Sequence, residues 1–160
     1  MSTFNAPVAT LTWDRDYTAI LKITGQYTSS AGASNTKILS ANNVKFANSN
    51  KPCFLDVVGI QYNMGLANGF VSLEFNNPAG NVTIATFGKR ESGDQAVYIT
   101  NPGTANANAS NTNGFGDLNL FTTALDANDS FTITVALRKN DFNGAFANVG
   151  LAFDSPWHGP

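Results

Sequence analysis

Apolar and polar residues alternate along most of this chain, and this two-residue period limits its fold more than any other feature. Successive side chains of a β-strand point to opposite faces, so the alternation predicts strands that are buried on one side. The clearest example runs from Phe131 to Leu137. No window of about 12 residues, the length of an average helix, holds an apolar helical stripe that Gly, Pro or Asn does not interrupt. The pattern therefore predicts an all-β protein.

Short segments with this alternation recur at spacings typical of strands joined by turns. Residues 53–64 carry apolar side chains on both faces of their first half, so we expect that half to be buried on both sides. The segments from which the strands are expected to form are Val8 to Trp13, Thr18 to Tyr27, Lys37 to Leu39, Val44 to Phe46, Cys53 to Met64, Val71 to Phe75, Val82 to Thr86, Gln95 to Thr100, one beginning at Leu118, Phe131 to Leu137, and Val149 to Phe153. The sequence thus predicts a jelly-roll-like β-sandwich of about eight to ten short strands, with an up-and-down barrel as the alternative.

The length of 160 residues is sufficient for one domain with its own core. We assign residues 17–153 to the β-sandwich domain, residues 1–16 to an N-terminal arm or first short strand, and residues 154–160 to a C-terminal tail. Three Asn-Gly dipeptides predict turns with positive φ. They are Asn68-Gly69, Asn113-Gly114 and Asn143-Gly144.

Charged residues make up only 12% of the chain, and the formal net charge is −2. The nine Lys and Arg residues are scattered, whereas a surface that binds phosphates needs several of them clustered. We therefore expect no nucleic-acid partner. No apolar run approaches the roughly 18 residues of a membrane helix, and no secretory signal is visible. We expect synthesis in a cytoplasm and no membrane partner.

The residues that most often carry catalysis or bind metals are scarce. His158 is the only histidine and lies in a tail bounded by Pro and Gly, where a catalytic base would not be held beside its nucleophile. Cys53 is the only cysteine and lies in an apolar run typical of a core. One His and one Cys cannot form a structural zinc site within one chain. We expect no enzymatic activity, no catalytic residues, no cofactor and no metal site.

Acidic pairs are the remaining catalytic candidates, because a glycosidase needs two carboxylates. The close pairs all fall in segments predicted as turns, where Asp commonly bonds to nearby backbone. These pairs are Asp14 with Asp16, Glu91 with Asp94, and Asp126 with Asp129. The segment that begins at Asp126 starts like a calcium loop but lacks the Gly and the Glu that such a loop requires at its sixth and twelfth positions. Asp56 lies in a strand and is expected to be buried and paired, with Lys51 or an Arg.

Large aromatic residues near the termini are the candidate partner-binding residues. They are Phe4, Trp13 and Trp157. Aromatic side chains dominate the binding energy of many interfaces, so Phe4 or Trp157 is expected to anchor an arm on a neighbouring subunit. The alternative is that Trp157 folds back over its own sandwich. An exposed Trp could also stack on sugar rings.

The segments Tyr17 to Tyr27, Asn35 to Leu39 and Phe131 to Lys139 resemble the head decoration, or cement, proteins of tailed bacteriophages. This resemblance implies a small jelly-roll protein, often a homotrimer, that binds the major capsid protein on the outer surface of an assembled head and stabilises it. It brings no catalytic residues. It adds the capsid to the neighbouring subunit as an expected site for the arm that Phe4 or Trp157 anchors. The alternative is a lectin-like carbohydrate-binding module of a phage or extracellular assembly. An exposed aromatic platform with polar neighbours would favour sugar binding, whereas apolar oligomer contacts would favour the virion protein.

Overall fold

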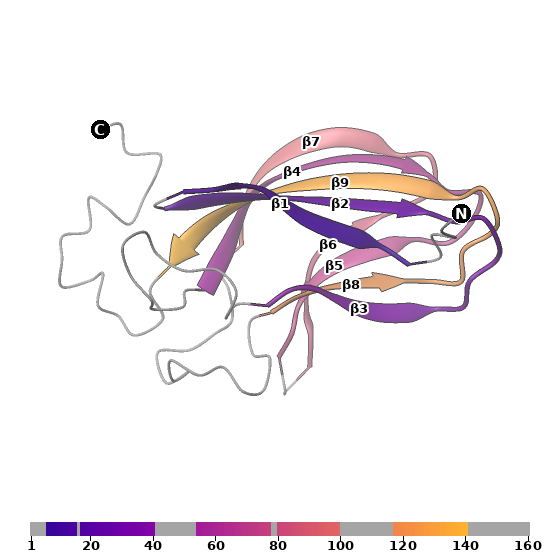
Figure 1. Cartoon of the computed structure of the whole chain (residues 1–160), viewed down its shortest axis with the longest axis horizontal. Coiled ribbons are helices and arrows are strands. Elements are labelled where there is room, and N and C mark those ends of the chain that lie inside the picture. Colours follow the sequence, from indigo (N-terminus) through magenta and orange to yellow (C-terminus); the bar gives the residue numbers. More distant parts are fainter. Residues whose placement is uncertain (1–5, 16, 41–53, 78–79, 100–116, 141–160) are drawn as a thin grey trace.

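The computed structural model describes residues 6–15, 17–40, 54–77, 80–99 and 117–140, which form two stacked β-sheets (Figure 1). This part of the chain contains nine strands, a number within the predicted range. They are β1 (Val8–Asp14), β2 (Thr18–Gln26), β3 (Ser34–Leu39), β4 (Phe54–Gly65), β5 (Val71–Phe75), β6 (Val82–Phe87), β7 (Ser92–Ile99), β8 (Leu118–Thr122) and β9 (Ser130–Asn140).

The strand order is that of a jelly roll. One sheet has the order β1-β2-β9-β4-β7 and the other has the order β3-β8-β5-β6, with every pair antiparallel. Setting β1 aside, the first strand pairs with the last and each later strand with the next one inward: β2 with β9, β3 with β8, β4 with β7, and β5 with β6. Such nested pairing is what a long antiparallel hairpin produces when it rolls up into two sheets. The all-β jelly-roll prediction is confirmed, and the barrel alternative is wrong because the described strands form two separate sheets.

The apolar half of the alternating pattern forms the core between the sheets. In β2 and β9, alternate residues from Leu21 and from Phe131 point inward, so Ile23 lies directly opposite Ile133. Burying a side chain of this size stabilises a fold by roughly 1.5–3 kcal/mol. The largest fully buried side chains of the described residues are Phe75, Leu21, Ile23, Leu55, Leu66, Leu73, Leu118, Leu120, Leu125, Ile133 and Leu137.

Strand β4 departs from simple alternation. Its register against β9 shifts between Val57 and Gly59, where a bulge inserts one residue. The shift brings Val57 onto the same inner face as Ile60, although strict alternation places them on opposite faces. Residues 55–58 are all buried, as predicted for the first half of this strand.

Several strand boundaries differ from the predicted ones. Strand β7 spans Ser92–Ile99, so it begins before the apolar residues that predicted a start at Gln95. Strand β9 continues to Asn140, because backbone pairing with β4 extends past the last residue of the apolar alternation. The predicted strands at 44–46 and 149–153 lie outside the described residues, as do Cys53 and His158. Gly69 has a φ of 78°, as the Asn-Gly prediction requires, and the other two dipeptides lie outside the described residues.

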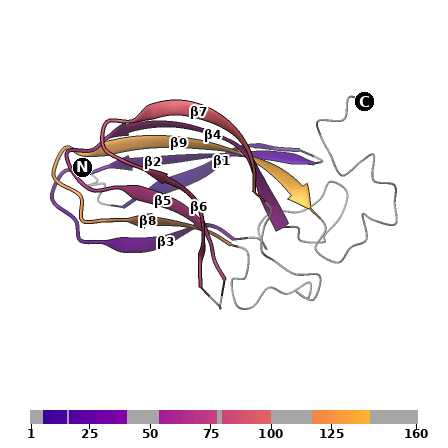
Figure 2. The same ribbon diagram turned by 180° about the vertical axis from the view of Figure 1, so that it is seen from behind.

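Four connections join the two sheets at one end of the sandwich, which we call the crossover end (residues 27–33, 66–70, 88–91 and 123–129). This end is on the right in Figure 1 and on the left in Figure 2. Backbone hydrogen bonds link these connections. The Tyr27 amide donates to the Asp129 carbonyl over 2.9 Å, and the Asn128 amide donates to the Tyr27 carbonyl over 2.8 Å. The crossover end is therefore a cross-linked edge that holds the adjoining strand ends in place.

Candidate functional site

Trp13 is the one predicted partner-binding residue that falls within the described part of the chain. It faces outward from β1, opposite Ile20, and is 45% exposed. The Trp13 Nε1 donates to the Thr18 hydroxyl over 3.3 Å, and the Arg15 guanidinium carbon lies 4.6 Å from the centre of the indole ring. Such a cation–π contact holds an exposed ring in place by about 0.5–1 kcal/mol. Phe4 and Trp157 lie outside the described residues.

Strand β1 forms an exposed edge, which we call the β1 edge. It pairs with β2 on one side and has no strand partner on the other among the described residues. Val8 and Trp13 both lie on it, and they are two of the three large hydrophobic side chains exposed in the described chain, the third being Phe70. From Val8 to Trp13 the strand carries no charged residue. Proteins usually protect such edges with Lys or Pro, so an uncharged edge with exposed apolar side chains is suited to binding another chain.

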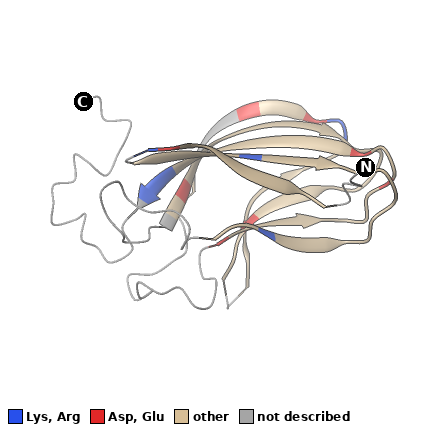
Figure 3. Cartoon of the chain, in the orientation of Figure 1, with Lys and Arg blue, Asp and Glu red and all other residues tan. Residues whose placement is uncertain are grey.

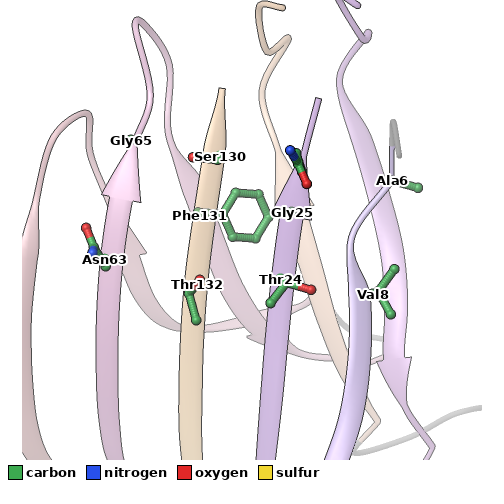
Figure 4. Close-up of a pocket in the computed structure, with 10 residues that line it drawn as sticks. Ala6, Val8, Thr24, Gly25, Asn63, Gly65, Ser130, Phe131 and Thr132 are labelled. Atoms are coloured by element: carbon green, nitrogen blue, oxygen red, sulfur yellow. The ribbon is translucent and has the colours of Figure 1, made fainter. Parts of the chain in front are cut away.

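A second surface feature lies on the outer face of the five-stranded sheet, near the crossover end. It consists of two adjacent hollows of about 430 and 560 Å3, which share Asn63 and Thr132, and we call them together the outer groove. Figure 4 shows the first hollow, with Asn63, Thr132 and Thr24 on neighbouring strands. Gly65 and Ser130 lie opposite each other at its end, and their small side chains leave the space open.

The strand registers arrange the outer side chains of this sheet in rows across all five strands, and most of these side chains are polar. The first row is Val8, Thr24, Thr132, Asn63 and Ser92. The second row is Thr10, Lys22, Thr134, Gln61 and Asp94. With strands about 4.8 Å apart, each row is about 19 Å long. The residues of this surface belong to the polar half of the alternating pattern, but the sequence alone does not predict that they lie side by side.

The floor of the first hollow includes Phe131, whose ring lies between β9 and β2 (Figure 4). The ring is only 3% exposed because it packs over Gly25 on the inner side of the sheet. Tyr62, which lines the second hollow, is half-buried, and its ring packs on Phe87 with 4.7 Å between the ring centres. The described lining residues therefore include no fully exposed aromatic ring on which a sugar could stack.

The acidic residues act mainly as structural ligands of the backbone and of basic side chains. Lys139, which is buried, donates from its Nζ to Asp14 and to the Arg15 carbonyl, and so ties the turn after β1 to β9. Glu91 accepts from the Gly88 amide over 2.8 Å. Asp129 accepts from the backbone at the crossover end. The contacts of Glu91 and Asp129 are the turn chemistry predicted for the acidic pairs. The prediction is wrong for Asp14 and Asp94, which lie within β1 and β7 because backbone pairing extends these strands past their apolar residues. Asp16 lies outside the described residues.

Asp56 is fully buried, as predicted, and lies opposite Arg138 in the register of β4 and β9. Its place far from the outer groove gives it no access to a ligand there. Among the described residues no three His, Cys, Asp or Glu side chains gather closely enough to bind a metal ion. The same residues contain no helix long and apolar enough to cross a bilayer.

Tyr27 lies at the crossover end, and its hydroxyl is buried. Burial raises the pKa of its phenol above the ordinary value, the nearby Thr122 side chain lowers it in part, and the Asp129 carboxylate raises it. The tyrosine therefore stays neutral at physiological pH. Its ring lies 6.4 Å from that of Phe131, which places it in the core beneath the groove.

Comparisons with known proteins show similarity of fold only. No protein-family model matches the chain, and no curated protein matches it. A cupin domain from Bordetella pertussis Tohama I is 11% identical, with 88% of this chain and 98% of that one covered and a TM-score of 0.29. A mutant of CBM29-2, a family 29 carbohydrate-binding module, is 13% identical, with 85% and 94% covered and a TM-score of 0.35.

Proposed function

We propose that this protein is a structural component of a virion, a decoration or cement protein that binds the major capsid protein on the outer surface of an assembled phage head and stabilises it. The observation that carries the proposal is the β1 edge. It offers an unpaired strand edge together with exposed Val8 and Trp13, which suits binding to another protein.

The charge distribution supports a protein partner of low charge. Lys, Arg, Asp and Glu are few on the described strands, and most of both sheets is neutral (Figure 3). A neutral partner surface can approach the β1 edge without leaving a charge buried and unpaired. Main-chain hydrogen bonds to an open strand edge supply affinity, while side chains such as Trp13 supply specificity.

Cosedimentation with heads that lack the protein tests this proposal. The wild-type chain is expected to pellet with such heads at a saturating ratio, and mass spectrometry of native particles is expected to find it at high copy number. Thr10→Lys places a charge in the middle of the β1 edge and is expected to weaken the binding about tenfold or more, since the ammonium would be desolvated.

Thr83→Lys is the matched control, because Thr83 is also an exposed threonine on an edge strand, β6 of the other sheet. It adds the same charge and is expected to leave cosedimentation unchanged. Absence of the chain from purified particles, or equal effects of the two lysine variants, would contradict the proposal.

A further inference from the structure

The first row of the outer groove contains hydrogen-bonding side chains without any charge. Thr24, Thr132 and Ser92 supply hydroxyl groups and Asn63 supplies an amide. Each of these groups can both donate and accept hydrogen bonds. Within the described part of the chain none of these four side chains is engaged in a hydrogen bond with another residue, so they are available to a ligand.

The groove lacks the charges that a strongly ionic ligand needs. Binding a phosphate or a carboxylate takes Arg or Lys side chains, preferably several. The two rows contain a single cation, Lys22, and a single acid, Asp94, which lies on β7 and is separated from Lys22 by two strands. The lining therefore favours a neutral ligand that carries many hydroxyl groups.

An apolar margin completes the groove on the β1 side. Ala6 and Val8 line the first hollow there, and Val8 is 46% exposed. Sugar rings present C–H groups on one face and hydroxyl groups at their edges. A ring lying at the β1 side can place its C–H face against Val8 and its hydroxyls against Thr24. Thr132 and Asn63 lie about 10 and 14 Å along the row from Val8, so they would contact the next ring of the same chain.

The length of the row sets the size of the ligand. Row one is about 19 Å long, and the two hollows continue into each other at Asn63 and Thr132. A chain of several sugar rings is therefore a better match than a single ring. Backbone hydrogen bonds at the crossover end hold the adjoining ends of β2, β4 and β9 in place, so the strands that form the groove keep their relative positions.

We infer that the outer groove binds a neutral oligosaccharide, lying across β1, β2, β9, β4 and β7. Because the lining offers hydrogen bonds and a small apolar contact but no exposed aromatic ring, we expect weak binding, with a dissociation constant of about 0.1–1 mM for a trisaccharide. Multiple copies on one particle would raise the apparent affinity by avidity.

The test is a titration of the full 15N-labelled chain with maltotriose, cellotriose and triacetylchitotriose, accompanied by a glycan array of neutral and acidic glycans. At least one neutral glycan is expected to bind saturably and to shift the amide signals of residues 24–26, 63–65 and 130–132. Trigalacturonate, an acidic trisaccharide, is expected to leave them unchanged.

Two variants locate the binding. Thr132→Val removes the central hydroxyl at nearly constant volume and is expected to weaken binding about tenfold, and Asn63→Ser shortens the exposed amide with a similar effect. Thr83→Val on β6 is the matched control and is expected to bind normally. Each variant is first shown to keep the wild-type melting temperature and amide spectrum, and Asn63→Ser decides the matter if Thr132→Val does not fold.

Failure of every neutral glycan to bind would overturn the inference. Retained affinity in both groove variants, or a preference for acidic glycans, would overturn it as well. Because Thr132→Val leaves the β1 edge intact, its cosedimentation with heads is expected to be normal. Failure of the glycan inference is therefore distinguishable from failure of the proposed virion function.

Discussion

At the scale of single residues, Gly25 and Phe131 pack closely against each other near the crossover end. The two residues are direct cross-strand partners in β2 and β9. A Cβ on Gly25 would overlap the Phe131 ring, and the ring is buried in the core and has little room to move. The glycine is therefore required by the close approach of the ring.

We predict that Gly25→Ala lowers the free energy of unfolding by about 1–3 kcal/mol, because overpacking forces buried side chains out of their preferred rotamers. Urea unfolding measures the loss. Gly32→Ala is the control, since no atom lies within 4 Å of a Cβ built there, and its effect is expected to stay within about 0.5 kcal/mol. The double variant Gly25→Ala with Phe131→Leu should recover part of the loss, and an equal loss for Gly25 and Gly32 would contradict the packing argument.

At the scale of elements, the buried carboxylate of Asp129 joins two of the four crossover connections. One oxygen accepts from the Ala67 amide over 2.8 Å and the other accepts from the Asp126 amide over 2.8 Å. The first bond reaches the connection between β4 and β5, and the second closes the turn between β8 and β9. Asp129 thus connects the turn that leads into β9 of one sheet with the segment that leads into β5 of the other sheet.

Asp129→Asn is predicted to lower the free energy of unfolding by about 1–3 kcal/mol, because the amide keeps one acceptor oxygen and leaves one part-buried backbone N–H without its partner. Thermal or urea unfolding provides the measurement. Asp126→Asn is the matched control: Asp126 is exposed, and its carboxylate only accepts a long 3.4 Å bond from Asn68. Equal losses for the two variants would show that the buried bonds are not the cause.

At the scale of the whole molecule, low charge and open sheet edges favour self-association. Interspersed charge normally keeps small domains apart, and only 12% of this chain is charged. We predict a homotrimer, whose mass by multi-angle light scattering at micromolar concentration is three times 16.9 kDa. A monomer would contradict this prediction. Because the β1 edge is proposed to contact the capsid, Thr10→Lys is expected to leave the trimer intact while head binding is lost. Dissociation of the trimer by this substitution would show instead that the β1 edge forms the subunit contact.

The sequence by itself determined the fold class, the position of most strands and the composition of the core. Alternation is a local property, so residues such as Phe131 to Leu137 reveal their strand and its buried face without any partner. Turn chemistry is local too, which is why Gly69 and the Asp126–Asp129 turn were predictable. Trp13 could be selected as a candidate by its residue type, but the sequence could not show that it lies on an open sheet edge.

Only the tertiary structure decided which strands are neighbours and in what register. The pairing of β2 with β9 joins segments from opposite ends of the chain, and backbone hydrogen bonds, which every residue offers alike, make it. The bulge in β4 lies where this strand pairs with β9. Because of the bulge, Val57 and Ile60 share the inner face, although strict alternation assigns them to opposite faces. The outer groove exists because register sets Thr24, Thr132 and Asn63 side by side, although they are far apart in sequence. Alternation determines which side chains face outward, but it does not determine which strands lie side by side, so only the folded chain shows this surface.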